Sequence, residues 1–566
     1  MTAVAYDAIV VGSGMSGGWA AKELAEHGLR TLVLEAGRMI TPERDYLMAA
    51  PASDFPYRLL NDPKETAEKF AIQRRSVGFG EDTKQFFIDD REHPYTLSEG
   101  SQFSWLRSRV LGGRSILWGR QVYRWSDLDF EANLRDGVGV DWPIRYADIA
   151  PWYEYVEKFV GISGEALGLP YLPDSHFQPP MAMSCAEEQV KAGMSKAFGT
   201  SRVMTIGRVA VLTAPLNGRA PCHYCDSCSR GCTTGSYFNS VHATLPAAMR
   251  TGRCTIRPFS VVHSVVYDEK SRRATGVRVI DAESKTAIEF KAPLVFLCAS
   301  ALESARILMN SSTRSHPHGL GNSSDQLGRN IMDHIKGAGA SGRVEGLDDK
   351  TSFGRRPNGV YIPRHHNLDP KKPDPKFIRG FGFQGGATGR GPLWGSATNR
   401  PGFGADFKTS LRGIGGWNFS LGGFAECLPN PENRLQIDPD VKDAWGIPGV
   451  KISARWRDNE LALQKEMADS AAEMLEAAGV KGVTANRGAP PPMGQTNHEM
   501  GTARMGRSPK SSVLNQWNQL WDVPNVYVTD GAAMASSSCV NPSLTYMALT
   551  ARAVDHAVRQ LKQKRV

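Results

Sequence analysis

The 566-residue sequence lacks any apolar run long enough to cross a membrane. Its most apolar stretch, residues 292–309, contains Glu303 and Arg306, whereas a spanning helix needs about 20 predominantly apolar residues. The N-terminus has neither the basic region nor the cleavage site of a signal peptide. We therefore expect no transmembrane segment, and either a cytoplasmic location or a periplasmic one reached by co-export with a signal-bearing partner.

Blocks of like charge are also missing. Lys and Arg number 67 against 58 Asp and Glu, a formal net charge of +9, but the basic residues are spread along the chain. A nucleic-acid-binding arm would need them concentrated. The fractions of hydrophobic (41%) and charged (22%) residues are typical of globular proteins, and the length suits two or three domains. The composition predicts a multidomain globular protein that binds no nucleic acid.

Cysteine is scarce, with nine residues, and its distribution is not that of a secreted disulfide framework. Four of the nine form the run C-x2-C-x2-C-x3-C, at Cys222, Cys225, Cys228 and Cys232. Thiolates at this spacing favour a metal centre, and the run resembles the iron–sulfur ligand runs of bacterial ferredoxins. Zinc and a pair of disulfides are the alternatives. The sequence predicts an iron–sulfur cluster in segment 221–233.

The N-terminal region carries a dinucleotide-binding fingerprint. Residues 7–11 (DAIVV) and 31–34 (TLVL) are short apolar runs typical of buried parallel strands. Between them lies G-x-G-x-x-G, formed by Gly12, Gly14 and Gly17. These glycines permit a tight turn, the approach of a pyrophosphate and close helix–strand packing, while Glu35 can accept ribose hydroxyls. The pattern predicts a βαβ unit that binds FAD or NAD, since an acidic residue disfavours NADP.

The rest of the chain adds a sheet-rich region and a terminal strand–helix pair. Residues 254–297 alternate Val and Ile with polar residues and predict a meander of strands. Residues 456–480 are expected to be helical, and a strand near 526 precedes a long helix over 543–564. Residues 46–99 show no regular pattern. Together these patterns predict an α/β fold.

Several motifs in fixed order give the chain a wider resemblance. They read GSGMSGG at 12–18, LGGRSILWG at 111–119, CASALESARIL at 298–308, LGRNIMDH at 327–334 and HEMGTARMG at 498–506. By these motifs and the terminal strand–helix pair, the chain resembles the glucose–methanol–choline (GMC) oxidoreductase family over nearly its whole length. The resemblance implies a Rossmann-like FAD-binding domain with an interleaved α+β substrate domain that contains a β-sheet.

Both implied domains are discontinuous. The FAD-binding domain is expected to comprise residues 1–45, 100–125, 205–335 and 495–566, with 221–233 as its cysteine segment. The substrate-binding domain is expected to comprise residues 126–204 and 336–494. Residues 46–99 form an irregular connection.

The resemblance also implies site residues. His498 and Asn541 correspond to the catalytic pair at the flavin, and a neutral His is suited to accept the proton of an alcohol. Asn541, beside Pro542, could also cap the last helix. Contacts to FAD are implied for Gly12, Gly14, Gly17, Glu35, Gly112, Gly113, Ser115, Val262, Ala299, Asp530, Gly531 and Asn541. Some members link FAD covalently through a His in the second glycine motif, but Leu117 stands at that position, so FAD is expected to be noncovalent.

Within the family, the pattern is most similar to the flavin subunits of bacterial sugar dehydrogenases such as glucoside 3-dehydrogenase. This implies oxidation of a sugar or glycoside hydroxyl, with C3 as the best candidate. Electrons would leave through the cluster to a cytochrome c or a quinone, with a small subunit as partner. Three-iron clusters in these relatives use three cysteines, matched by Cys222, Cys228 and Cys232, so a three-iron cluster is favoured and Cys225 leaves a four-iron one open. Alternatives are an O2-using oxidase, a gluconate or glucose dehydrogenase acting at another carbon, and a non-enzymatic flavoprotein.

Overall fold

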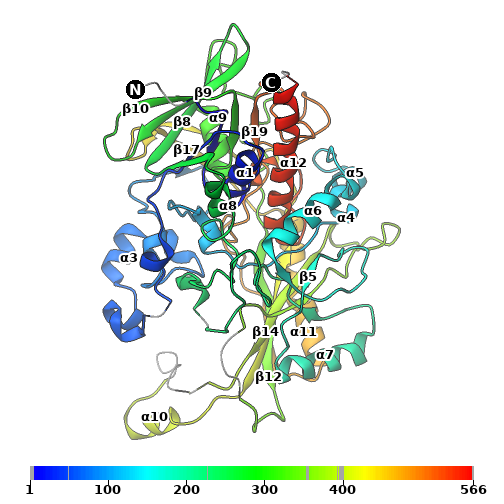
Figure 1. The fold of residues 1–566 in the computed structure, drawn as a ribbon. Coiled ribbons are helices and arrows are strands. Elements are labelled where there is room, and N and C mark those ends of the chain that lie inside the picture. The colour runs from blue at the N-terminus through cyan, green and yellow to red at the C-terminus, as the bar shows by residue number, and fades with distance from the viewer. Residues whose placement is uncertain are drawn as a thin grey trace.

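A computed structural model describes residues 5–48, 50–225, 227–351, 356–391, 393 and 401–563. Figure 1 shows an elongated molecule whose upper half contains the first strand, β1 (Ala8–Val11), and the last helix, α12 (Ser543–Lys562). The lower half is built around a long sheet that includes β12 (Ile335–Val344) and β14 (Phe381–Thr388). The two ends of the chain therefore lie in the same half.

The upper half contains a five-stranded sheet in the order β19-β11-β1-β2-β7, and all of its neighbouring strands are parallel. The other strands are β2 (Thr31–Leu34), β7 (Cys254–Arg257), β11 (Leu294–Leu297) and β19 (Val526–Val528). β1 is buried on both faces, because Ile9 and Val11 belong to one hydrophobic cluster while Ala8 and Val10 belong to another. Burial of both faces explains why these strands read as continuous apolar runs.

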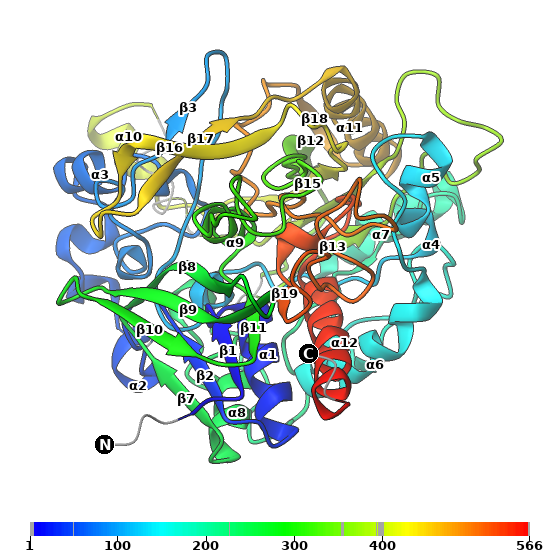
Figure 2. The same cartoon turned by 90° about the horizontal axis from the view of Figure 1, so that it is seen from above.

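Helices pack beside this sheet. Helix α1 (Met15–Glu26) contacts α8 (Thr244–Arg250) and α12, which in turn contacts α6 (Tyr146–Val160). Figure 2 shows α1, α8 and α12 gathered beside the parallel strands. The predicted βαβ unit and terminal strand–helix pair are thus present, and the predicted α/β class is confirmed.

A three-stranded antiparallel sheet precedes β11. It consists of β8 (Ser260–Asp268), β9 (Arg273–Asp281) and β10 (Ala287–Lys291). After β11 the chain enters helix α9 (Ala301–Met309), which packs against β8. The meander expected over residues 254–297 is thus present from β8 to β10, whereas β7 and β11, at the two ends of that range, pair in the parallel sheet instead.

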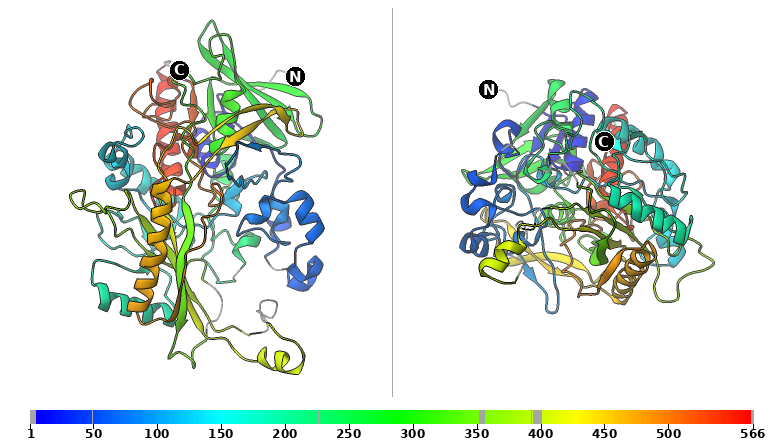
Figure 3. Two further views of the ribbon diagram at one scale, coloured as in Figure 1. Left: turned by 180° about the vertical axis from the view of Figure 1, so that it is seen from behind. Right: turned by 90° about the horizontal axis from the view of Figure 1, so that it is seen from below.

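The lower half is a six-stranded antiparallel sheet in the order β18-β12-β15-β14-β13-β6. Its other strands are β6 (Thr205–Ile206), β13 (Val360–Ile362), β15 (Trp417–Ala425) and β18 (Lys481–Asn486). Helices α11 (Asp458–Ala477) and α7 (Cys185–Phe198) bury apolar side chains such as Leu463 and Val190 with Phe383 and Phe419 of the sheet. Figure 3, left, shows α11 in orange lying along the sheet.

Shorter elements complete the chain. The remaining α-helices are α2 (Pro42–Asp45), α3 (Pro63–Lys69), α4 (Asp127–Phe130), α5 (Ala132–Asp136) and α10 (Gly404–Ser410). The remaining strands are β3 (Thr96–Leu97), β16 (Arg434–Lys442) and β17 (Pro448–Ser453) in one small sheet, with β4 (Ile162–Ser163) and β5 (Phe177–Gln178) in another. Short 3-10 turns are η1 (Ala52–Asp54), η2 (Pro56–Leu59), η3 (Gln73–Arg75), η4 (Lys84–Phe86), η5 (Gly113–Ile116), η6 (Cys228–Arg230) and η8 (Gly531–Ala533). Within the described ranges, no helix is both long and apolar enough to span a bilayer.

Candidate active site

A cavity of about 380 Å³ collects side chains from the parallel sheet, from η5 and from the six-stranded sheet. Its volume is in the range typical of small-molecule sites. Most of the predicted site residues line it, namely Gly12, Gly14, Glu35, Gly113, Ser115, Val262, Ala299, His498, Asp530, Gly531 and Asn541. Gly17 and Gly112 instead shape the backbone next to it. One cavity therefore brings together residues more than 500 positions apart in the sequence.

The first glycine motif forms one end of this cavity. Gly12 has φ of 91°, which favours glycine, and a Cβ on Gly17 would lie only 1.9 Å from the carbonyl oxygen of Gly12. Gly17 thus lets α1 begin directly beside β1. A Cβ on Gly14 would have no atom closer than the Gly112 oxygen at 3.8 Å, so the space before it is open. An open cradle at the N-terminus of α1 fits a pyrophosphate.

Glu35 follows β2 at the same end. Its buried carboxylate accepts hydrogen bonds from the backbone N–H groups of Ser13 (3.2 Å) and Gly37 (2.9 Å) and from the Ser13 hydroxyl. Burial raises the pKa of Glu35, and these hydrogen bonds oppose that rise. A carboxylate offers about four acceptor positions, so one remains for a ribose hydroxyl.

Several buried polar atoms on the cavity wall have no hydrogen-bond partner within the part of the chain that the structure describes. They are Arg109 Nη1, Asn310 Nδ2 and Tyr546 Oη. Buried polar groups are normally satisfied, so these three fit donors to a bound polar ligand. Together with the open glycine cradle, they fit FAD at this cavity.

The second glycine motif lies next to the first and is hydrogen-bonded to it. Gly112 and Gly113 have φ of 88° and 49°, and the Gly112 N–H donates to the Ser13 hydroxyl (2.9 Å). The Ser115 hydroxyl donates to the Gly112 carbonyl (2.6 Å), which closes the turn of η5. Leu117, where a linking His would stand, lines the cavity. This turn therefore presents backbone and an aliphatic side chain to the cofactor region.

Asp530 follows β19 and also lines the cavity. Its carboxylate accepts from the hydroxyl of Ser304 (2.5 Å) and from the N–H groups of Ser300 (3.0 Å) and Ala532 (2.9 Å). Burial raises its pKa to about 6. Asp530 thereby ties the end of β19 to the start of α9 at the cavity edge.

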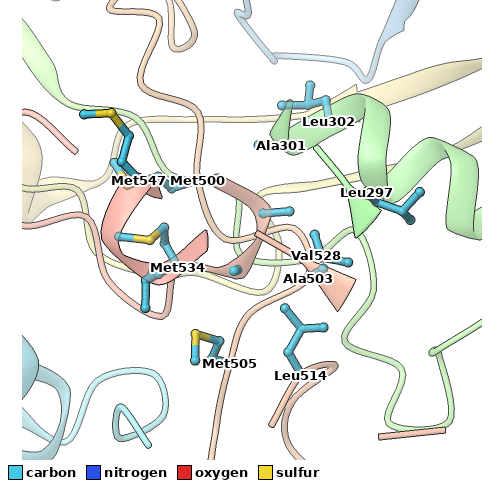
Figure 4. Packing of buried hydrophobic residues seen from close by; sticks show 14 of the residues in the cluster. Leu297, Ala301, Leu302, Met500, Ala503, Met505, Leu514, Val528, Met534 and Met547 are labelled. Carbon is cyan, nitrogen blue, oxygen red and sulfur yellow. The ribbon is translucent and has the colours of Figure 1, made fainter. Parts of the chain in front are cut away.

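A buried carboxylate holds the loop that carries His498. Asp333 accepts from the N–H groups of Gly494 (2.8 Å), Thr496 (3.1 Å) and His498 (3.1 Å). Burial, with the neighbouring charge of Glu499, raises the pKa of Asp333 to about 7. After the loop, Met500, Ala503 and Met505 pack around Val528 and Met534, as Figure 4 shows. The backbone at His498 is therefore fixed by hydrogen bonds on one side and by the core on the other.

A second histidine determines which nitrogen of His498 is free. His334 Nε2 lies 3.0 Å from the carbonyl oxygen of Ser537, which can only accept, so Nε2 carries the proton. Burial lowers the pKa of His334 to about 4, so the ring is neutral and its Nδ1 accepts from His498 Nδ1 at 2.8 Å. Burial also lowers the pKa of His498 well below its ordinary value. His498 is therefore neutral, with the lone pair on Nε2.

Asn541 is oriented by a residue from the other half of the molecule. Gln384 on β14 donates from Nε2 to Asn541 Oδ1 at 2.6 Å. The amide N–H2 of Asn541 is then left to donate. Helix α12 begins at Ser543 with Pro542 as its cap residue, so the interpretation of Asn541 as the helix cap is wrong. Asn541 is held by a side chain across the cavity instead.

These two hydrogen bonds give the cavity complementary groups for a hydroxyl. The His498 Nε2 lone pair can accept an O–H proton, while the Asn541 amide can donate to the same oxygen. Both residues line the cavity together with Phe424 of β15, whose ring centroid is 6.4 Å from that of His498. This arrangement suits proton abstraction from an alcohol.

The four cysteines of the run line a second, smaller cavity with Met48 and Tyr237. All nine cysteines are free thiols, so the structure gives no support to the disulfide alternative. Among the described residues, no three His, Cys, Asp or Glu side chains are arranged to hold a metal ion; Asp226, inside the predicted segment, lies outside those residues. The thiols face one space and could provide the donors of a cluster.

Tyr237 connects the two cavities. Its ring lines the cysteine cavity, and its hydroxyl donates to the carbonyl of Ile116 in η5 at 2.7 Å. The guanidinium of Arg120, which lines the main cavity, lies 4.9 Å from the centroid of the same ring. The cysteine segment is thus adjacent to the turn that faces the proposed flavin site.

Sequence reasoning missed three residues that position the pair. Asp333 and His334 lie inside the LGRNIMDH motif, which had been noted only for its resemblance. No sequence motif marks Gln384, because it lies in a Gly-rich strand, 157 positions before its partner Asn541.

Comparisons with known proteins show the family of the chain. Residues 6–336 and 429–550 match the two models described as GMC oxidoreductase. The 2-methyl-1,2-propanediol dehydrogenase of Mycolicibacterium austroafricanum is 29% identical over 98% of this chain and 95% of its own. The fructose dehydrogenase large subunit of Gluconobacter japonicus is 26% identical over 98% of each. A solved formate oxidase from Aspergillus oryzae RIB40 has a TM-score of 0.62 at 13% identity, covering 99% of this chain and 98% of that one.

The fold and the cavity define an FAD-dependent oxidoreductase that acts on alcohol or sugar hydroxyl groups. The chain belongs to the GMC oxidoreductase family.

Proposed function

We propose that this enzyme is a dehydrogenase that oxidises a secondary alcohol of a sugar or glycoside, with the C3 hydroxyl as the preferred position. The observation that carries the proposal is the His498–Asn541 pair, one accepting and one donating, on the wall of a cavity that fits FAD. The similarity to a relative named for fructose supports a sugar. The resemblance of the sequence to glucoside 3-dehydrogenases favours C3.

In the proposed reaction, the substrate hydroxyl donates to His498 Nε2 and accepts from the Asn541 amide. His498 takes the hydroxyl proton as the C–H bond breaks, and the alcohol becomes a ketone. FAD, when bound, supplies the acceptor for the hydride. Asn541, held by Gln384, keeps the carbon–oxygen bond in one orientation during transfer. Asp333 and His334 keep the base in place and in the reactive tautomer.

Anaerobic mixing with sugars tests this function. Glucose, methyl glucosides and gluconate should bleach the flavin absorbance, and turnover should be supported by dichlorophenolindophenol and not by O2. NMR of the product should place the new carbonyl at C3. Faster turnover with O2 would favour an oxidase instead, and a carbonyl elsewhere would favour a gluconate- or glucose-type dehydrogenase. No bleaching by any of these compounds would contradict the proposal.

We also propose that the cysteine run holds an iron–sulfur cluster, with three irons favoured over four. The supporting observations are four thiols on one cavity and the side chain of Tyr237, which lines that cavity and bonds η5. A bound cluster would supply a one-electron acceptor beside the flavin.

Replacing Cys228 with Ser tests the cluster. The electron paramagnetic resonance signal of protein purified without oxygen should disappear, and electron delivery to a cytochrome should slow. Flavin reduction by sugar should be nearly unchanged. Cys185→Ser, which alters a cysteine outside the run, is the matched control. Zinc or no metal in the wild-type protein would refute the cluster.

The same scheme predicts a small subunit and a cytochrome c as partners. Fructose dehydrogenase, similar over its whole large subunit, is named as one part of an assembly. Co-expression with a neighbouring small subunit that carries an export signal, followed by cell fractionation, would decide between periplasmic and cytoplasmic location. Purification as a single chain that turns over cytochrome c unaided would contradict the need for the subunit.

A further inference from the structure

One cation in the main cavity is not used by the proposed reaction. Lys336 lies near the start of β12, where it pairs in register with Phe424 of β15. Both side chains line the cavity together with His498. Lys336 is half-buried, and burial lowers the pKa of its ammonium group. The substrate domain thus places an ammonium group beside the catalytic base.

The Lys336 ammonium forms no hydrogen bond or ion pair with any residue that the structure describes. The negative charge of Asp333 raises the pKa of Lys336 and so opposes the effect of burial. The oxygens of that carboxylate are occupied by backbone N–H groups, those of Gly494, Thr496, His498 and His334. An ammonium group on a cavity wall that donates to no described residue is free to donate to a ligand that accepts hydrogen bonds.

The carboxylates that line the cavity are all engaged elsewhere. They are Glu35 with Ser13 and Gly37, Glu303 with Arg109 and Arg306, Glu499 with Arg114, and Asp530 with Ser304 and Ala532. Arg120, a second lining cation, bonds the carbonyl of Pro357 and no carboxylate of the described chain. None of the acidic side chains that line the cavity therefore forms an ion pair with Lys336 or Arg120.

We propose that Lys336 is a specificity residue that receives the carboxylate of the substrate, so that the preferred substrate is a sugar acid of the aldonate or uronate class. This inference rests on the proposed oxidation of a sugar hydroxyl. A charge-assisted hydrogen bond to Lys336 would anchor one end of the molecule. His498 and Asn541 would then meet a hydroxyl farther along the chain or ring. The same ammonium disfavours amino sugars by like-charge repulsion.

Sugars of different charge test whether Lys336 binds a substrate carboxylate. D-Gluconate and D-glucuronate serve as anions, D-glucose and methyl α-D-glucoside as neutral probes, and D-glucosamine as a cation. Lys336→Met, which keeps the length of the side chain, should raise KM for the anions by about tenfold or more. It should leave KM for the neutral probes within about twofold and lower KM for glucosamine. Lys336→Arg should recover most of the preference for anions. Lys408→Met, at an exposed position on α10, is the control and should change nothing.

A binding measurement separates this inference from the proposed function. Titration calorimetry of gluconate into holoenzyme with His498→Ala measures affinity without turnover. Adding Lys336→Met should abolish that binding. If no alcohol reduces the wild-type flavin, the proposed function fails while the binding result still decides the role of Lys336. Equal losses for anions, neutral probes and cations would overturn the inference and assign Lys336 to the charge of the reduced flavin.

Discussion

At the scale of single residues, two hydrogen bonds between side chains decide which atoms meet the substrate. His334 can accept from His498 only because its other nitrogen donates to the Ser537 carbonyl. Gln384 plays the corresponding part for Asn541, since its donation to Oδ1 leaves the amide N–H2 directed elsewhere. Neither partner needs to touch the substrate. The reactive arrangement is thus fixed before any substrate binds, which lowers the cost of orienting it during the reaction.

Replacing His498 with Ala should lower turnover by roughly 10²–10⁴-fold, the usual contribution of a general base. FAD should remain bound, because the open cradle at Gly14 and the hydrogen bonds of Glu35 do not involve this side chain. Stopped-flow bleaching of the flavin measures the loss, and the ratio of flavin to protein absorbance checks occupancy. Near wild-type turnover would remove His498 from the mechanism.

The pH dependence of flavin reduction should reflect the lowered pKa of His498. A histidine with the ordinary pKa of 6.5 would be half protonated at that pH and would lose half its activity as a base. Burial lowers the pKa here, so the ring stays neutral and active at lower pH. The reduction rate should therefore remain nearly flat down through pH 6.5 and fall only in more acidic buffer.

An inflection near pH 7 in the profile of reduction rate against pH would indicate that a group other than His498 titrates there. Asp333, whose pKa burial raises to about 7, titrates in that range. Its replacement by Asn would remove such an inflection and leave the acidic limb of the profile in place. A profile that instead falls through pH 6.5 in both proteins would show that His498 titrates normally.

At the scale of elements, the sequence predicted the helices and strands that are marked by a pattern of neighbouring residues. β1, α1 and β2 follow from short apolar runs and a glycine turn, and α12 from a long helical period after a strand. The small strands of the six-stranded sheet were harder to place, because residues 340–440 are Gly-rich and pair with segments far away. β6, for example, contributes only Thr205 and Ile206 and pairs with β13. Gln384 could not be assigned to the site for the same reason, since its role depends on the register of β14 across the cavity.

The cysteine run shows which features a local spacing pattern predicts and which it does not. Its spacing predicted that four thiols would lie together, and they do face one cavity. Spacing alone did not predict that the Tyr237 ring would line this cavity while its hydroxyl bonds η5. Those features depend on how segment 221–233 folds against a turn about 100 residues earlier.

The turn η5 predicts noncovalent FAD. Leu117 occupies the position of a linking His, and its aliphatic side chain cannot form a bond to the flavin. Precipitation with acid should therefore release yellow flavin into the supernatant. As a control, a protein with histidyl-linked flavin should keep its colour in the pellet under the same treatment. Flavin that stays with the precipitated chain would contradict this prediction.

At the scale of the whole molecule, the active site is shared between its two halves. His498 and Asn541 belong to segments around the parallel sheet, whereas Gln384, Phe424 and Lys336 come from the six-stranded sheet. Buried Arg379, just before β14, also bonds Glu426 and Asn133 and so joins distant segments near the same region. Relative movement of the halves would break the hydrogen bond from Gln384 to Asn541 and release the amide that donates to the hydroxyl. The orientation of Asn541 therefore depends on the packing between the halves.

Removing FAD should destabilise the molecule as a whole. The cavity is lined by segments that begin at Val11 and end at Tyr546, and it leaves buried groups such as Tyr546 Oη without partners among the described residues. A ligand that binds only the folded state stabilises it by about 2.7 kcal/mol when its free concentration is 100 times Kd. Stripping FAD should lower the thermal midpoint by several degrees and speed proteolysis of the segments that line the cavity. Adding FAD back should restore both, while adding NAD should restore neither. An unchanged midpoint after complete removal would mean that the two halves hold together without the cofactor, and that the unpartnered groups are satisfied by water alone.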